Sequence, residues 1–289
     1  MLMHTLARRL LASSAALAIV AAAAHAEPLL FDNGTFVTGV GTGPGGTDIS
    51  QADPSPGVIT IGFNANAAPP TGPLRVGDDF IISGAPAGGG GVRLNHMHFY
   101  GVQSNSITTN VQFGAIYVAI YNASPAAGGT IIAGDFTTNR LRSSTWTNAY
   151  RLSSSGSPST SRPITRLDVD MSWVPALQDG TYFMMVSAVG DVALTANPNP
   201  QAIFVTPHRV TDNGLQYANS NYIATYDYPF KLFGYCPADF NFSGGTTIDD
   251  LFLYFNAWFT GALAADFNNQ DGVTIDDLFL YINAWFGTC

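Results

Sequence analysis

The sequence predicts a mostly β protein, an antiparallel β-sandwich or jelly roll followed by a small all-α segment. Short runs of alternating apolar residues, separated by Gly, Pro, Asn and Ser, fill residues 27–235. No helix-length periodic segment occurs there, and proline is too frequent for long helices. Two nearly identical acidic stretches, each leading into an apolar run of helix length, occupy residues 236–289.

Residues 1–26 have the pattern of a signal peptide. Two arginines precede an apolar run at 10–24, and Ala24-His25-Ala26 is typical of a cleavage site. The run is too short for a membrane anchor, and no charges that stop transfer follow it. We therefore expect an exported protein, extracellular, at the cell surface or periplasmic. The expected mature chain begins at Glu27 and has no membrane span.

Residues 27–235 are predicted to form one β-sandwich domain. Turn-forming dipeptides separate its apolar runs, as in a sheet of short antiparallel strands. The clearest strand candidates are Gly57–Phe63, Asp78–Ile82, Ala115–Tyr121, Gly180–Val186 and Tyr228–Gly234. The turn signals are Asn33-Gly34, Gly45-Gly46, Gly128-Gly129, Asp179-Gly180 and Asn213-Gly214.

Residues suited to catalysis are scarce in this domain. Glu27 is the only glutamate, so a glycosidase would need aspartate for both carboxyl roles. Asp168 and Asp170 lie two apart on one strand face, but Arg166 nearby favours an ion-paired surface over a catalytic pair. The acidic balance and the single lysine, Lys231, argue against nucleic acid as a partner. The sequence favours a non-enzymatic domain.

His96 and His98 point to one side of a predicted strand, opposite to Met97 and Phe99. Two imidazoles placed in this way could bind a transition metal together with a third ligand. Histidines on a polar sheet surface are the commoner explanation. The sequence leaves both interpretations open.

The acidic stretches place oxygen donors at the spacing of an EF-hand loop, where positions 1, 3, 5, 7 and 12 surround Ca²⁺ and position 7 uses its carbonyl. We therefore predict two Ca²⁺ sites. The ligands of the first are Asp239, Asn241, Ser243, Gly245 and Asp250; those of the second are Asp266, Asn268, Gln270, Gly272 and Asp277. The runs 247–250 and 274–277 also match capping boxes, and we expect both roles together.

The charge of the repeats favours bound cations. Residues 236–289 contain seven aspartates and no Lys, Arg or Glu, and carboxylates so close together oppose compaction. Two Ca²⁺ ions would reduce the formal charge from −7 to −3.

The tandem loop-helix, with copies 27 residues apart, resembles a type I dockerin, the module that binds cohesin domains. Cys-Pro-Ala-Asp-Phe-Asn at 236–241, the Gly-Gly-x-Thr-Ile-Asp-Asp-Leu run and the terminal Gly-Thr-Cys are similar to the GC-type dockerin-like anchor of exported planctomycete proteins. The chain differs in ending Gly-Thr-Cys rather than Gly-Cys, and in having Gln270 and Asp271 in the second loop. The resemblance, over residues 236–289, implies a cohesin-like or other cell-surface anchoring partner. Residues 27–235 resemble uncharacterised sandwich domains more loosely, with no activity implied.

Cys236 and Cys289 are the only cysteines and lie at the two ends of the repeats. In an oxidising compartment, such a pair most simply forms one disulfide. The alternative is that Cys289 is a reactive end used for covalent attachment.

The two apolar runs are too hydrophobic all round to bury every side chain against each other. Residues at i, i+3, i+4 and i+7 are expected to pack between the helices, and four phenylalanines remain on a different face. We predict that these four contact the partner: Phe252, Phe259, Phe279 and Phe286.

The sequence therefore predicts an exported, non-enzymatic β-sandwich protein, anchored or assembled through a calcium-binding module. A carbohydrate-binding domain is the main alternative, and a polysaccharide hydrolase of a cellulosome-like complex is a further one. In the carbohydrate-binding case, sugars would stack on exposed rings among Tyr117, Tyr121, Trp146, Tyr150 and Trp173.

Overall fold

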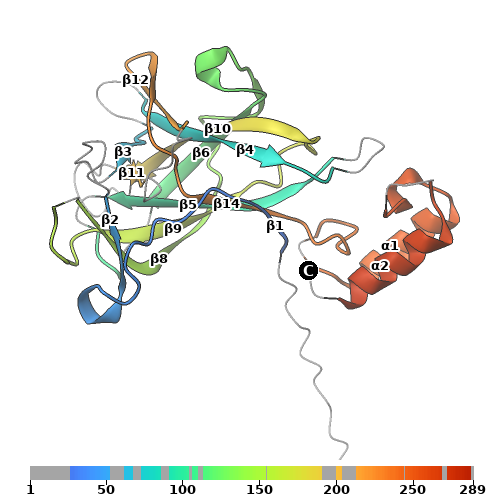
Figure 1. The fold of residues 1–289 in the computed structure, drawn as a ribbon. Coiled ribbons are helices and arrows are strands. Elements are labelled where there is room, and N and C mark those ends of the chain that lie inside the picture. Colours follow the sequence, from blue (N-terminus) through green and yellow to red (C-terminus); the bar gives the residue numbers. More distant parts are fainter. Residues whose placement is uncertain are drawn as a thin grey trace, which may run out of the picture.

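The computed structural model describes residues 27–52, 62–67, 73–85, 91–103, 106–109, 113–153, 155–190, 200–203, 213–243, 245–268 and 272–287. The predicted signal peptide, residues 1–26, lies outside this part of the chain. The described part is mostly β, with two sheets and two α-helices near its C-terminal end (Figure 1).

The larger sheet has eight strands, and its main path follows the order β1-β14-β5-β9-β8-β2. The second half of β5 also pairs with β11, which in turn pairs with β3. The strands are β1 (Leu29–Asp32), β2 (Asp48–Gln51), β3 (Phe63–Asn64), β5 (Leu94–Gln103), β8 (Leu141–Leu152), β9 (Pro163–Asp170), β11 (Pro200–Ala202) and β14 (Phe230–Gly234).

The smaller sheet has six strands in the order β13-β12-β4-β10-β6-β7. They are β4 (Arg75–Ile82), β6 (Phe113–Tyr121), β7 (Ile131–Asp135), β10 (Gly180–Gly190), β12 (Leu215–Ala218) and β13 (Asn221–Ala224). Short 3-10 helices are η1 (Pro44–Gly46), η2 (Pro125–Ala127) and η3 (Leu263–Ala265).

One hydrophobic core lies between the two sheets, because alternate residues of facing strands point toward each other. The larger sheet contributes apolar side chains from β5, β9 and β14, and the smaller sheet contributes side chains from β4, β6 and β10. Fully buried members include Met97 on β5, Val169 on β9, Phe80 on β4 and Ile116 on β6.

The strands predicted around residues 78–82, 115–121, 180–186 and 228–234 are present as β4, β6, β10 and β14. Most of the run predicted at 57–63 lies outside the described residues. One pairing differs from the antiparallel prediction, since β2 runs parallel to β8. The two strands lie about 100 residues apart in the chain, and a parallel pair needs such a long connection rather than a tight turn.

The burial of β6 also differs from the sequence expectation. Ile116, Val118 and Ile120 face the core as expected. On the opposite face, Tyr121 is buried too, because Phe183 and Leu215 belong to a second apolar cluster with it.

A buried polar network joins the two sheets. Asp78 on β4 accepts hydrogen bonds at Oδ2 from Asn33 Nδ2 (2.7 Å) and from the backbone N–H of Tyr228 (2.8 Å). Asn33 also donates to the Tyr228 carbonyl. Because Asn33 follows β1 and Tyr228 precedes β14, one carboxylate of the smaller sheet fixes two segments of the larger one.

The helices are α1 (Ile248–Phe259) and α2 (Ile275–Phe286), which include the two predicted apolar runs. Both begin at a threonine in extended conformation, Thr247 or Thr274, with a complete capping box. They lie to one side of the sheets (Figure 1). Near the end of β14, the Arg93 guanidinium lies 4.5 Å from the centre of the Phe242 ring, between the larger sheet and the first loop.

Among the described residues, no helix combines the length and the apolar character needed to cross a bilayer.

The Asp78 network makes a prediction about stability. Burial, with the nearby charge of Asp227, raises the pKa of Asp78 from 3.8 to about 8. The folded protein therefore holds this proton more tightly than the unfolded chain, and the associated stability is lost as pH rises from about 4 to 8. We expect Asp78→Asn to flatten the fall in unfolding free energy across this range. Urea unfolding at several pH values measures it.

Asp78→Ala should instead lower the unfolding free energy by about 2–4 kcal/mol, because it leaves two buried donors without this acceptor. Asp79→Asn is the matched control, since its side chain lies on the opposite strand face. An equal flattening by Asp79→Asn would show that Asp78 is not the source of the pH dependence.

Candidate functional sites

The first acidic loop brings its predicted ligands together. Asp250 accepts the backbone N–H of Asn241 at Oδ1 (3.0 Å), which joins positions 12 and 3. Ser243 donates its backbone N–H to Asp239 Oδ1 (2.9 Å) and to Asn241 Oδ1 (2.8 Å). Its hydroxyl also lies 3.4 Å from the Gly245 carbonyl oxygen. The carboxylates at positions 1 and 12, Asp239 and Asp250, are both buried.

In the described part of the second loop, the same hydrogen bond joins positions 3 and 12. Asn268 donates its backbone N–H to Asp277 Oδ1 at 2.9 Å, and Asp277 is fully buried. Asp266 is half-buried at the start of the loop, and Gly272 adopts a left-handed backbone with φ 76°. Gln270 lies outside the described residues.

Position 12 has a second role in each copy. Asp250 Oδ2 accepts both the backbone N–H (2.7 Å) and the hydroxyl (2.9 Å) of Thr247, and Asp277 does the same with Thr274. One oxygen of each carboxylate therefore caps a helix while the other closes a loop. Asp249 and Asp276 occupy the first helical turns and are exposed, where they complement the helix dipole.

The donor set of these loops fits a hard cation. It consists of carboxylate, amide, hydroxyl and carbonyl oxygens, which Ca²⁺ prefers. Burial alone would raise the pKa of Asp277, but hydrogen bonds from Asn268 and Thr274 hold it below its ordinary value. A carboxylate kept ionised in this way is in the form that binds a metal.

The two repeats stabilise each other through equivalent contacts in both directions. The Tyr254 and Tyr281 rings stack at a centroid distance of 3.7 Å, and both are fully buried. The Tyr254 hydroxyl donates to the carbonyl of Ala265 (2.9 Å), and the Tyr281 hydroxyl donates to that of Ala238 (3.1 Å). Each tyrosine thus holds the start of the other copy's loop.

Two tryptophans extend this exchange. Trp258 Nε1 donates to the Thr274 carbonyl at 2.6 Å, and Trp285 Nε1 donates to the Thr247 carbonyl at 3.0 Å. Since both acceptors are the capping residues of the opposite helix, each helix start depends on the other copy. Each contact from the first repeat to the second therefore has an equivalent contact from the second to the first, as in a two-fold symmetric pair.

The four predicted contact phenylalanines lie on the surface. Their exposed fractions are 64% for Phe252, 78% for Phe259, 59% for Phe279 and 77% for Phe286. Leu253 and Leu280, at equivalent positions of the two helices, are also exposed and were not among the predicted contact residues.

Cys236 is buried and disulfide-bonded. The Thr246 hydroxyl lies 3.5 Å from its Sγ. Cys289 lies outside the described residues.

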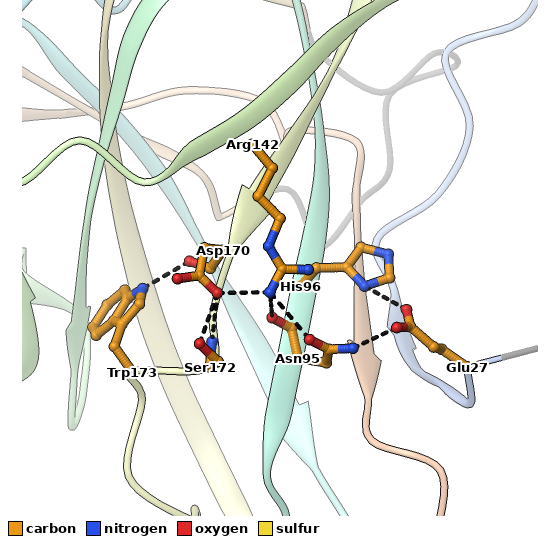
Figure 2. A network of polar contacts seen from close by, with 7 residues as sticks. All are labelled: Glu27, Asn95, His96, Arg142, Asp170, Ser172 and Trp173. Atoms are coloured by element: carbon orange, nitrogen blue, oxygen red, sulfur yellow. Dashed lines mark hydrogen bonds and ion pairs between the residues drawn. The ribbon is translucent and has the colours of Figure 1, made fainter. Parts of the chain in front are cut away.

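A second polar region lies on the outer face of the larger sheet. His96 and His98 on β5 stand opposite Asp170 and Asp168 on β9. Glu27 links Asn95 and His96, and its Oε2 lies 2.5 Å from His96 Nδ1 (Figure 2).

Arg142 continues this network toward β9. It bridges Asn95 and Asp170, and its Nη2 lies 2.7 Å from Asp170 Oδ1 (Figure 2). The expected ion pair on this strand face is therefore present at Asp170, but its partner is Arg142 rather than Arg166. Ser172 donates two further hydrogen bonds to the same oxygen.

His98 and His96 combine with Asp168 into a compact cluster. One ligand atom from each residue lies within 4.8 Å of the others. Burial, with the positive charge of Arg166, lowers the pKa of His98 to about 4, and burial also lowers the pKa of His96. Both imidazoles are therefore neutral at pH 7. The sequence identified the histidine pair but could not identify Asp168 as its neighbour.

A pocket of about 250 Å³ opens on the same face, one strand position further along. It is lined by Phe36, Tyr100, Thr145, Trp146, Thr147 and Arg166. Of the five rings among which exposed ones were expected, Tyr121 and Tyr150 are buried, and Tyr117, Trp146 and Trp173 are partly exposed. Of these five rings, Trp146 alone lines the pocket.

The chain matches no family model, no curated protein and no solved structure.

Proposed function

We propose that the chain is an exported β-sandwich protein that attaches to a cohesin-like or other cell-surface anchoring protein through residues 236–289, a calcium-binding module of the dockerin type. The observation that carries the proposal is the set of equivalent, reciprocal contacts between the two repeats. Because the repeats are equivalent, the module has two similar acidic loops and two similar stripes of exposed phenylalanines.

In this proposal the acidic loops are calcium sites. Side chains at positions 1, 3, 5 and 12 and the carbonyl at position 7 would hold each ion, with Asp250 and Asp277 as the shared link to the helices. The supporting facts are the buried carboxylates at positions 1 and 12 of the first loop and the lack of any lysine or arginine in residues 236–289. Bound Ca²⁺ would supply the missing positive charge.

The docking surface consists of the exposed stripes on α1 and α2. Large apolar side chains in contiguous exposed positions are typical of a protein-binding surface. The interior positions of both helices are occupied by Tyr254, Tyr281 and the tryptophans, so the phenylalanines are not needed to hold the helices together. Because the two stripes are equivalent, either one can contact the partner.

The calcium proposal predicts a stoichiometry of two. Calorimetric titration of the full-length protein with Ca²⁺ should give two sites with dissociation constants of about 10⁻⁵ to 10⁻³ M, since neither loop has glutamate at position 12. Asp250→Asn and Asp277→Asn should each remove one site. The matched control, Asp249→Asn, makes the same charge change at an exposed neighbour and should keep both. Absence of binding at millimolar Ca²⁺ would refute the proposal.

The docking proposal predicts graded loss of binding. On immobilised cohesin domains, Phe252→Ala with Phe259→Ala should weaken binding of the calcium-loaded protein modestly, because the second stripe remains. Adding Phe279→Ala and Phe286→Ala should abolish it while calcium uptake continues. Tyr254→Ala shows the effect of truncating a buried ring, for comparison. It should lower the unfolding free energy by about 3–5 kcal/mol, whereas the phenylalanine variants should not. A quadruple variant that unfolds, or that still binds, would disprove this assignment.

Carbohydrate binding by the β-sandwich is the second candidate, and the pocket beside Trp146 favours it. The pocket combines aromatic rings with threonine hydroxyls and a guanidinium, which suits a sugar ring and its hydroxyl groups. On a glycan array, Trp146→Ala should abolish any signal of the native protein. Tyr117→Ala, which changes a partly exposed ring on the other sheet, should leave it unchanged. An equal loss in both variants would place the binding elsewhere.

A further inference from the structure

Three side chains on the outer face of the larger sheet have the composition of a transition-metal site. His96 and His98 extend from the same face of β5, and Asp168 on β9 stands directly opposite His98. Their ligand atoms lie within 4.8 Å of one another. Two imidazoles and a carboxylate form a donor set that binds divalent zinc, iron and similar metals.

Within the part of the chain that the structure describes, Asp168 has no ion pair of the kind that its neighbours have. Asp170 pairs with Arg142, and Asp32 pairs with Lys231 Nζ at 2.8 Å. Among the described residues, nothing hydrogen-bonds to the buried Oδ1 of Asp168. A buried carboxylate oxygen without a donor costs free energy, and a bound cation would remove that cost.

Glu27 prepares His96 for coordination. Its carboxylate accepts a hydrogen bond from His96 Nδ1, which leaves the lone pair of that imidazole on Nε2. A carboxylate behind a metal-bound histidine is the usual outer support of such sites, because it fixes the tautomer and the ring orientation. The His96 ring is also stacked on Phe233 at a centroid distance of 4.5 Å.

We propose that His96, His98 and Asp168 bind a divalent transition metal of the zinc class, with Glu27 as the supporting carboxylate. Ligand atoms around a tetrahedral zinc ion, with bonds of about 2.0–2.1 Å, lie about 3.3 Å apart. Small side-chain rotations must therefore bring the three ligand atoms closer together when the metal binds. A fourth position remains for water or for a ligand in the adjacent pocket. Tyr100 and Arg166, the next pair along β5 and β9, line that pocket.

The test uses the full-length protein saturated with Ca²⁺, so that the acidic loops do not compete. Co²⁺ should bind with a stoichiometry of one, give visible d–d absorption, and be displaced by Zn²⁺. His98→Ala and Asp168→Asn should both lose the spectrum. Asp168→Asn is nearly isosteric, so its circular dichroism should stay native.

Two further variants separate the site from its surroundings. Asp170→Asn makes the same chemical change two residues away on the same strand face and should retain binding. Glu27→Gln should weaken Co²⁺ affinity about 10–100-fold, the usual effect of losing an outer carboxylate. Wild-type binding by both His98→Ala and Asp168→Asn would overturn the proposal, because the metal would then lie elsewhere. Absence of any Co²⁺ or Zn²⁺ binding to the native protein would overturn it as well.

Discussion

The alternation of side chains along β5 is the constraint on which the architecture of residues 27–235 depends. β5 is hydrogen-bonded between β14 and β9 in the larger sheet, so its residues must divide between two faces. Met97 and Phe99 fill the core on one face. His96 and His98 meet the polar residues of β9 on the other. A shift of one residue in the pairing would exchange the two sets and destroy both the core and the polar cluster.

In the C-terminal repeats, single residues make two stabilising interactions each. Asp250 caps α1 with one oxygen and closes its loop with the other. Tyr254 fills the space between the helices and holds the opposite loop. A single repeat would lack both the stacked ring and the hydrogen bond from its twin. The repeats therefore form one cooperative unit, and the four exposed phenylalanines are not part of its interior.

The two regions proposed to bind metal ions differ in chemistry. The acidic loops offer oxygen donors, as hard cations require, whereas His96 and His98 offer nitrogen donors that prefer transition metals. The two proposals therefore differ in the class of ion that each region would prefer. The disulfide at Cys236 is compatible with the exported location that the proposal assumes.

The sequence by itself determined what depends on neighbours along the chain. Alternating apolar runs predicted β4, β6, β10 and β14, and the Thr247 to Asp250 capping box predicted the start of α1, because strand alternation and helix capping are local. Only the tertiary structure could decide which distant residues meet. It placed Asp168 opposite His98 on the neighbouring strand, and it buried Tyr121 in an apolar cluster beside Phe183. Those outcomes follow from cross-strand register and sheet packing, which local sequence does not encode.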